Sequence, residues 1–271
     1  MLPERKNTIL RSLIQEYVIS AYPVASSTLV RYYVPRLSAA TVRNELNWLE
    51  HRGYVVAPHT SAGRMPTTTG YRTFVNNLLL HPYSSALRQR DGAGGSVGTV
   101  RSASLATIAT ASDKLAMIPE ILAFFAEQNK GLMVFWAPQL SNAIIHRGLP
   151  ILLSQPEFAE TSAALPIMQL LESHGELMAI FKDILSTDCL HIKIGSEHKD
   201  SQLYEFSLVA QRFDCAHLTT STSNKTPSIK PDANYGVVAL FGPTRMNYEW
   251  AISSISSLVK NLESSAHYQR N

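Results

Sequence analysis

Apolar residues in the first eighty positions recur every three or four residues, which is the spacing of amphipathic helices. The pattern predicts a helix over residues 4–21 and a second over about 26–33, which Ser26 or the serine after it can cap. A third helix is predicted to begin after Ser38, its N-cap, and to stop at Gly53.

The segment after the third helix has a different pattern. Residues 54–56 are a short apolar strand, and residues 58–66 are too polar and too rich in turn formers to lie in a core. We expect an exposed hairpin loop there, after which Thr67 or Thr68 opens another helix. Three short helices, a strand, an arginine-bearing loop and a returning segment follow one another in the order of a winged helix-turn-helix.

The rest of the chain divides into a low-complexity stretch and a second folded region. Residues 81–112 are rich in Ser, Thr, Gly and Ala and predict a flexible linker between residues 1–80 and residues 113–271. The last region alternates helix-type and strand-type patterns, which makes the whole chain an α+β multidomain protein. Helical spacing is found at 115–126, at 165–185 with a break at Gly175, and at 250–262, and strand-type runs are found at 132–136, 190–194 and 237–241.

Composition limits the class of protein. Hydrophobic residues make up 45% of the 271 positions and charged residues 17%, which excludes wholesale disorder. Two cysteines, Cys189 and Cys215, cannot build a disulfide framework, and neither a secretory leader nor a membrane-spanning run is expected. The sequence therefore favours a cytoplasmic protein with no membrane partner.

Candidate catalytic and metal sites are weak. Asp188, Cys189 and His191 lie close together in the sequence, but a fourth zinc ligand at ligand spacing is missing. No local motif joins Cys215 to a histidine as nucleophile and base. We expect neither an enzyme nor a bound cofactor or metal ion.

Positive charge is concentrated near the N-terminus. Residues 1–80 contain nine Lys and Arg against four Asp and Glu, a net charge of +5, and the remainder carries −2. Eight of the nine cations are arginine, whose planar guanidinium suits phosphates and guanine edges. The uneven charge therefore favours nucleic acid as the partner of the N-terminal domain.

A winged helix-turn-helix presents base-reading groups on the first turn of its third helix, which enters the major groove. Arginine can bond guanine, asparagine can bond adenine, and small residues let the backbone approach phosphates. In the loop, Gly63 permits a tight turn, and Arg64 with His59 suits phosphates or the minor groove. The candidate DNA-contacting residues are Ser26, Ser38, Ala39, Thr41, Arg43, Asn44, His59, Ser61, Gly63 and Arg64.

Two stretches of the N-terminal domain carry a family resemblance. Residues 38–46 (SAATVRNEL) and 59–67 (HTSAGRMPT) closely resemble two signatures of the heat-inducible transcription repressors, the HrcA family. Ala25 stands where the family usually has glycine. Further stretches similar to the family are residues 2–5, 23–26, 70–75, 152–158, 194–197 and 242–248.

The resemblance implies a homodimeric repressor that binds an inverted repeat in double-stranded DNA upstream of chaperone operons. It also implies that the GroEL chaperonin maintains the active form, that the C-terminal domain is GAF-like, and that a dimerisation segment is inserted between the two domains. Only residues 82–149 separate the matching blocks, and half of them are low-complexity sequence. We therefore expect the insert to be reduced or absent.

Other functions fit the same residues. Helix-turn-helix folds also serve as protein-interaction modules, so an N-terminal domain that binds protein is an alternative. A ligand-gated regulator, whose GAF-like domain binds a metabolite, is another, although fold alone does not establish function. Arg245 follows an apolar strand and either binds an acidic ligand or clamps carbonyl groups of its own turn.

Overall fold

The computed structural model describes residues 2–59, 62–80, 111–138, 144–215 and 234–263. Nearly all of the predicted linker and the candidate Ser61 lie outside these described residues. The chain divides into two compact units, each of which is made of three separate segments of the sequence. The first contains Met1–Arg88, Ile194–Tyr204 and Thr244–Glu249, and the second contains Gln89–Lys193, Glu205–Pro243 and Trp250–Asn271.

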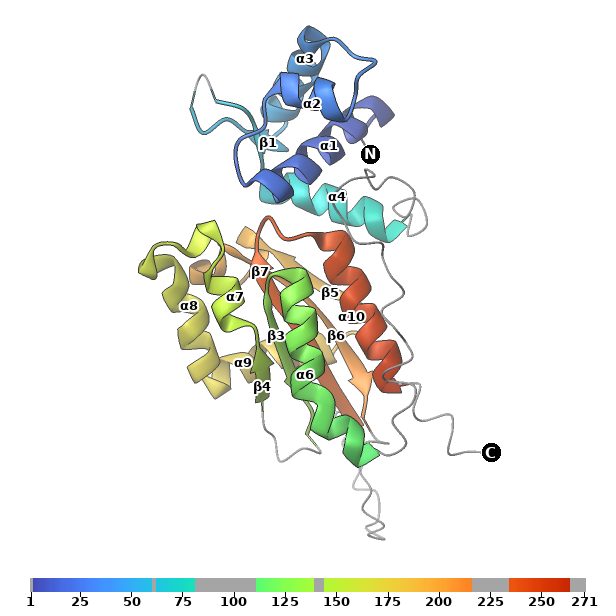
Figure 1. Cartoon of the computed structure of the whole chain (residues 1–271), viewed down its shortest axis with the longest axis vertical. Coiled ribbons are helices and arrows are strands. Elements are labelled where there is room, and N and C mark those ends of the chain that lie inside the picture. Colours follow the sequence, from blue (N-terminus) through green and yellow to red (C-terminus); the bar gives the residue numbers. More distant parts are fainter. Residues whose placement is uncertain (1, 60–61, 81–110, 139–143, 216–233, 264–271) are drawn as a thin grey trace, which may run out of the picture. The chain divides into compact units, whose positions relative to one another are not determined.

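The N-terminal part of the first unit is a cluster of helices with a small hairpin (Figure 1). Apolar side chains at helical spacing turn inward, so that Ile9, Leu13 and Leu49 are fully buried. The predicted order of three helices, a hairpin and a further helix is confirmed. The elements are α1 (Glu4–Ser20), α2 (Ser26–Tyr32), α3 (Ala39–His51), β1 (Val55–Val56), β2 (Met65–Pro66) and α4 (Thr68–Leu80).

Helix ends in this unit follow local chemistry, with one exception. Ser38 caps α3 as predicted, because its Oγ accepts a hydrogen bond from the Thr41 N–H at 3.0 Å. Gly53 adopts a φ of 75° just after α3, a conformation that favours glycine. The predicted serine cap for α2 is wrong, because Ala25 occupies the N-cap position and supplies no side-chain bond.

A third chain segment joins the hairpin. β1 and β2 pair antiparallel, and Val24 exchanges two backbone hydrogen bonds of 2.9 Å with Arg64. A Cβ atom on Gly63 would lie 2.5 Å from the carbonyl carbon and oxygen of Val24. The close approach of two backbones therefore requires glycine at position 63, which is a different reason from the predicted tight turn.

The second unit is built on a five-stranded sheet in the order β4-β3-β7-β6-β5. β3 pairs antiparallel with β4 and β7, and β6 pairs antiparallel with β7. The α+β class is therefore confirmed. The elements of the C-terminal half are α6 (Ala111–Asn129), β3 (Leu132–Trp136), β4 (Ile144–Arg147), α7 (Leu149–Leu153), α8 (Thr161–Glu172), α9 (His174–Leu185), β5 (His191–Ile194), β6 (Phe206–Asp214), β7 (Tyr235–Pro243) and α10 (Tyr248–Glu263).

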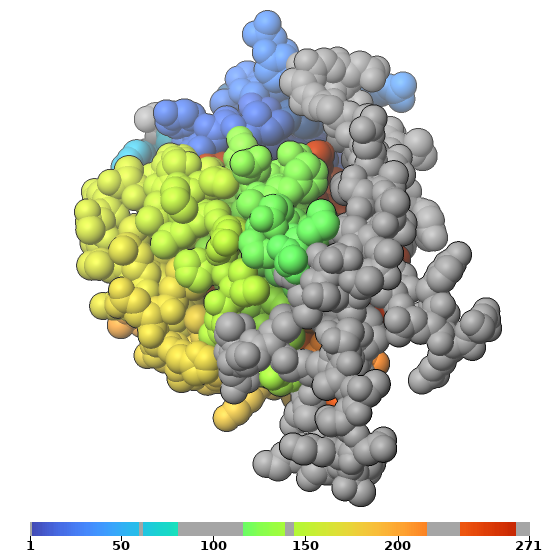
Figure 2. All heavy atoms as spheres, turned by 60° about the horizontal axis from the view of Figure 1, so that its bottom comes forward, coloured from blue at the N-terminus to red at the C-terminus, as the bar shows by residue number. Residues whose placement is uncertain are grey.

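Helices cover both faces of this sheet. Trp136 of β3 packs against Phe181 of α9, whereas its neighbour Phe135 points to the opposite face. α6 and α10 lie side by side against the sheet, and Asn129 of α6 bonds Ser254 of α10 at 3.0 Å (Figure 1). In the space-filling view, α6 lies next to the segment that runs from β4 to α9 (Figure 2). Strands covered on both faces are typically continuous apolar runs, and β3 and β7 have this pattern.

Most of the predicted C-terminal elements are confirmed, but the patterns do not predict β4 or β6. In β6, Ser207 and the pair Gln211 and Arg212 interrupt the apolar residues. The helical stretch over 165–185 breaks at Ser173, which caps α9, and not at Gly175 as predicted. No helix in the described part of the chain is long and apolar enough to span a bilayer.

Candidate nucleic-acid interface

The predicted recognition helix α3 has two faces of different chemistry. Val42, Leu46 and Leu49 are at most 3% exposed and join the core. Arg43 and Asn44 are exposed on other sides of the helix. Packing therefore fixes α3 while leaving its two candidate base-reading side chains accessible.

Two hydroxyl groups form hydrogen bonds at the first turn of α3. Ser38 Oγ lies 2.9 Å from Thr41 Oγ1 and also accepts the Thr41 N–H. Both side chains are therefore used within the helix. Ala39 beside them is exposed and leaves the backbone open, which is favourable for a phosphate at a helix N-terminus.

Ion pairing divides the nine cations of residues 1–80 into two groups. Five of them pair with carboxylates, namely Arg5, Lys6, Arg11, Arg64 and Arg72. The other four form no ion pair with any described residue: Arg31 lies on α2, Arg36 between α2 and α3, Arg43 on α3, and Arg52 directly after α3. In the described part of residues 1–80, arginine and lysine side chains without a protein counterion are thus confined to α2, to α3 and to the residues that flank α3.

Glu45 is a structural residue of this region that the sequence pattern did not single out. Its side chain on α3 is buried, and its Oε2 lies 2.8 Å from Lys6 Nζ while Oε1 pairs with Arg5. The hydrogen bond from Lys6 is the largest effect on the pKa of Glu45 and lowers it, although burial acts in the opposite direction. An acidic residue on the inner face of an amphipathic helix was the available signal, since such a group needs a partner.

Trp48 adds a second link between α1 and α3. Lys6 Nζ lies 4.8 Å from the centre of its ring, and the Arg52 guanidinium lies 5.2 Å from that centre. Both are cation–π contacts. Together with Glu45, the contact between Lys6 and Trp48 ties the start of α1 to α3.

Arg64 is engaged by α3. Its Nη2 lies 2.9 Å from Glu50 Oε2 and donates to Asn47 Oδ1 at 3.2 Å, and its Nη1 donates to Ala62 O at 3.3 Å. Glu50 also accepts the Ala57 N–H at 3.1 Å. The geometry thus makes Arg64 the tie between the hairpin and α3, whereas sequence reasoning treated it as a group directed at DNA.

The remaining candidates occupy different surroundings. His59 is exposed in the hairpin loop, and its side chain forms no hydrogen bond or ion pair with the residues that the structure describes. Ser26 is the first residue of α2 and is half-buried. The exposed candidates therefore come from α3 and from the hairpin loop.

A family model described as "HrcA protein C terminal domain" matches residues 93–252, more than half of the chain. The chain belongs to the HrcA family. This confirms the resemblance found in the sequence. It also extends that resemblance to a continuous stretch of the chain that includes residues of both units.

Two curated HrcA relatives match along nearly the whole chain. A "Heat-inducible transcription repressor HrcA" of Roseiflexus castenholzii is 27% identical over 344 aligned positions, covering 94% of this chain and 91% of the relative. Another, of Chloroflexus aggregans, is 27% identical over 363 positions, covering 96% and 93%. The 344 positions exceed the 271 residues of this chain by 73, so at least that many have no counterpart here.

A solved structure shares the fold of this HrcA chain. It is described as "Crystal structure of a hypothetical protein at 2.2 A resolution", and it matches with a TM-score of 0.70 at 16% identity. The match covers 98% of this chain and 100% of the other. At this identity the likeness concerns the fold alone.

The candidates in the C-terminal half of the HrcA chain make structural contacts. Asp188 pairs with Arg212, and the described residues contain no group of three or more His, Cys, Asp or Glu that could hold a metal ion. Arg245 is 9% exposed, and its Nη1 donates to Val18 O of α1 at 3.0 Å. Arg245 thus clamps a carbonyl group of α1, 227 residues away in the sequence, whereas the prediction named carbonyl groups of its own turn.

Proposed function

We propose that the protein is a transcriptional repressor that binds double-stranded DNA through a winged helix-turn-helix formed by residues 1–80. The observation that carries the proposal is the distribution of paired and unpaired cations in residues 1–80. Every arginine of this region without an ion pair to a described residue lies on or beside the helices of the helix-turn-helix. Phosphate contacts need such cations, because they provide most of the sequence-independent affinity for DNA.

Base reading is assigned to two side chains of α3. Arg43 matches the paired acceptors of guanine, and Asn44 matches the donor and acceptor of adenine. Arg31, Arg36 and Arg52 are assigned to phosphates. The exposed His59 and the hairpin loop contact the DNA beside the helix, while Arg64 holds the loop in place.

The repressor acts as a homodimer on an inverted repeat in front of chaperone genes, as the family resemblance implies. Two-fold symmetry in the protein matches two-fold symmetry in the operator, with half-sites about one helical turn apart or a multiple of it. Residues 113–271 are proposed to be a GAF-like effector and dimerisation domain. The relative from Roseiflexus castenholzii has at least 73 positions without a counterpart here, and we propose that they belong to the dimerisation insert.

Control by temperature is proposed to act through the effector domain, with the GroEL chaperonin restoring the active form. The names of the relatives support a role in the heat response, since they are called heat-inducible transcription repressors. Such a protein works in the cytoplasm, where the chromosome lies, and needs neither a catalytic site nor a cofactor.

The test is fluorescence anisotropy at two salt concentrations with a duplex that carries the inverted repeat and a duplex with scrambled half-sites. We expect a preference of about a thousandfold or more for the intact repeat. Equal binding to both duplexes, before and after incubation with GroEL and ATP, contradicts the proposal. Equal binding that becomes selective only after this incubation supports chaperonin control.

A further inference from the structure

Two short stretches from the C-terminal half of the chain belong to the first unit. Residues 194–204 begin at the last residue of β5, and residues 244–249 follow β7 directly. Both lie in the same compact unit as α1 to α4. We call these two stretches the clasp.

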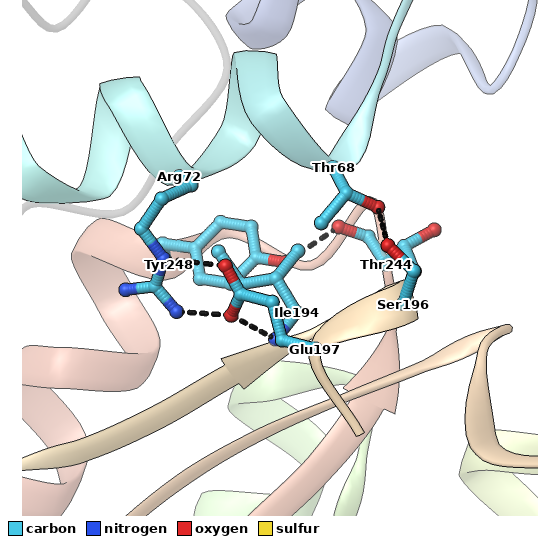
Figure 3. Close-up of polar contacts among 7 residues, drawn as sticks. All are labelled: Thr68, Arg72, Ile194, Ser196, Glu197, Thr244 and Tyr248. Atoms are coloured by element: carbon cyan, nitrogen blue, oxygen red, sulfur yellow. Dashed lines mark hydrogen bonds and ion pairs between the residues drawn. The ribbon is translucent and has the colours of Figure 1, made fainter. Parts of the chain in front are cut away.

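The clasp holds α4 through a paired charge. Arg72 of α4 donates from Nε to Glu197 Oε1 at 2.7 Å, and its Nη2 pairs with Glu197 Oε2 (Figure 3). The same Oε2 accepts the backbone N–H of Ile194 at 2.9 Å. Each of the two side chains is 28% exposed, so water screens this bidentate pair only in part.

Close packing accompanies the charge pair. The rings of Tyr71 on α4 and Tyr248 lie 5.6 Å apart, and both side chains are buried. The Tyr248 hydroxyl donates to Thr244 O at 2.7 Å, which fixes the ring from the clasp side (Figure 3). Gly195 has a φ of 49°, and a Cβ atom there would lie 2.9 Å from Thr68 Oγ1. The start of α4 therefore fits the clasp closely.

The clasp also supplies a hydrogen-bond donor to the C-terminal end of α1. The last turn of α1 contains no basic residue, and Arg245 supplies one by donating to Val18 O. A cation at this end offsets the helix dipole and satisfies a carbonyl that lacks a partner within the helix. About two turns toward the N-terminus of α1, Arg11 bonds Glu249 at 3.1 Å. The start of the same helix holds Glu45 of α3 through Arg5 and Lys6.

We infer that the clasp positions α1 and α4, and through them the recognition helix, so that DNA affinity depends on two segments attached to the sheet of the second unit. Glu197 and Arg245 are positioning residues in this account, since they act on DNA through α4 and α1. The inference rests on the proposed function only for its DNA readout.

The test uses charge reversal in the full chain. Glu197→Arg and Arg72→Glu are made singly and together, and amide hydrogen exchange is followed in α1, α3 and α4 without DNA. Operator affinity is measured by anisotropy in parallel. Each single variant is expected to speed exchange in α3 and α4 and to weaken operator binding on the order of tenfold, a usual size for coupling between sites. The double variant is expected to recover most of both losses, because the opposite charges face each other again.

A matched control and a milder variant complete the design. Asp183→Lys breaks the 3.3 Å pair of Asp183 with Lys193 in the second unit and is expected to leave α3 exchange unchanged. Glu197→Gln removes only the charge and is expected to weaken binding in the same direction by less. The inference is overturned if amide exchange in α3 is as slow in Glu197→Arg and Glu197→Gln as in wild type. It is also overturned if the double variant exchanges as fast and binds the operator as weakly as the single variants. If wild type binds intact and scrambled operators equally, both before and after incubation with GroEL and ATP, the proposed function fails, and the exchange data still test the clasp.

Discussion

The guanidinium of Arg64 lies 2.9 Å from the carboxylate of Glu50, and this pair joins the hairpin to the predicted recognition helix. Both residues are partly shielded, with side chains 19% and 32% exposed. Because Arg64 is already held by this carboxylate and by Asn47, the proposed function expects it to affect DNA binding by fixing the loop. Arg36 is exposed and forms no such pair with the described residues, so it is free to neutralise a phosphate.

The salt dependence of binding separates these two roles. Arg36→Ala is expected to reduce the slope of log affinity against log salt by about 0.9 for each protomer, because one phosphate contact is lost. Arg64→Ala is expected to weaken operator binding while leaving this slope close to wild type. Anisotropy titrations at four or more salt concentrations measure both, with Lys182→Ala on α9 as an exposed control. A slope reduced equally by Arg64→Ala would show that Arg64 contacts phosphate directly.

Glu45 predicts a dependence of stability on acid. Its pKa is lowered in the folded protein from an ordinary value of 4.5, chiefly by the Lys6 hydrogen bond. The ionised carboxylate therefore stabilises the fold above about pH 4.5. This contribution is lost as the pH falls from there through the lowered pKa.

Glu45→Gln is expected to cost about 1–3 kcal/mol of unfolding free energy at pH 7, because Lys6 and Arg5 lose their buried counter-charge. The cost should shrink at low pH, where the wild-type carboxylate is protonated too. Urea titrations of both proteins between pH 7 and pH 3 measure it, with the exposed Glu172→Gln as the control. A cost that stays constant over this range contradicts the role of the charge.

Gly63 tests the close approach of the hairpin to Val24. A methyl group there meets the Val24 backbone at 2.5 Å, and backbone cannot move aside as a side chain can. Gly63→Ala is expected to destabilise the protein by about 1–3 kcal/mol, in the range of overpacked sites. Gly175→Ala in α9 is the matched control, since nothing lies within 4 Å of its Cβ position, and it should stabilise by up to about 1 kcal/mol. Equal melting temperatures for the two variants in differential scanning fluorimetry would contradict the steric account.

Local chemistry was sufficient to predict much of the first unit. Helical spacing located α1, α3 and α4, and the Ser38 cap follows from a rule that involves only three neighbouring residues. The two apolar strands 132–136 and 237–241 were also readable, because strands covered on both faces are continuous apolar runs.

Contacts between distant positions were not readable from the sequence. Glu45 pairs with residues about forty positions away, and Arg245 reaches Val18 across 227 positions. No local rule specifies such partners, because only the folded backbone brings them together. The same limit applies to Arg64. Its neighbours in the sequence predict an exposed loop residue, but in the folded protein it contacts Glu50 and Asn47.

The most direct test of the account is a base-by-base substitution scan of the operator with wild-type protein and with Arg43→Ala. When one symmetric pair of guanines is substituted, wild type is expected to lose about 1–3 kcal/mol of binding free energy. Arg43→Ala is expected to lose this preference for guanine while keeping the base preferences at the other operator positions. Lys182→Ala serves as the control with an unchanged profile. A profile of Arg43→Ala that matches wild type at every position, with only uniform weakening or none, would contradict the assignment of α3 as the helix that reads DNA.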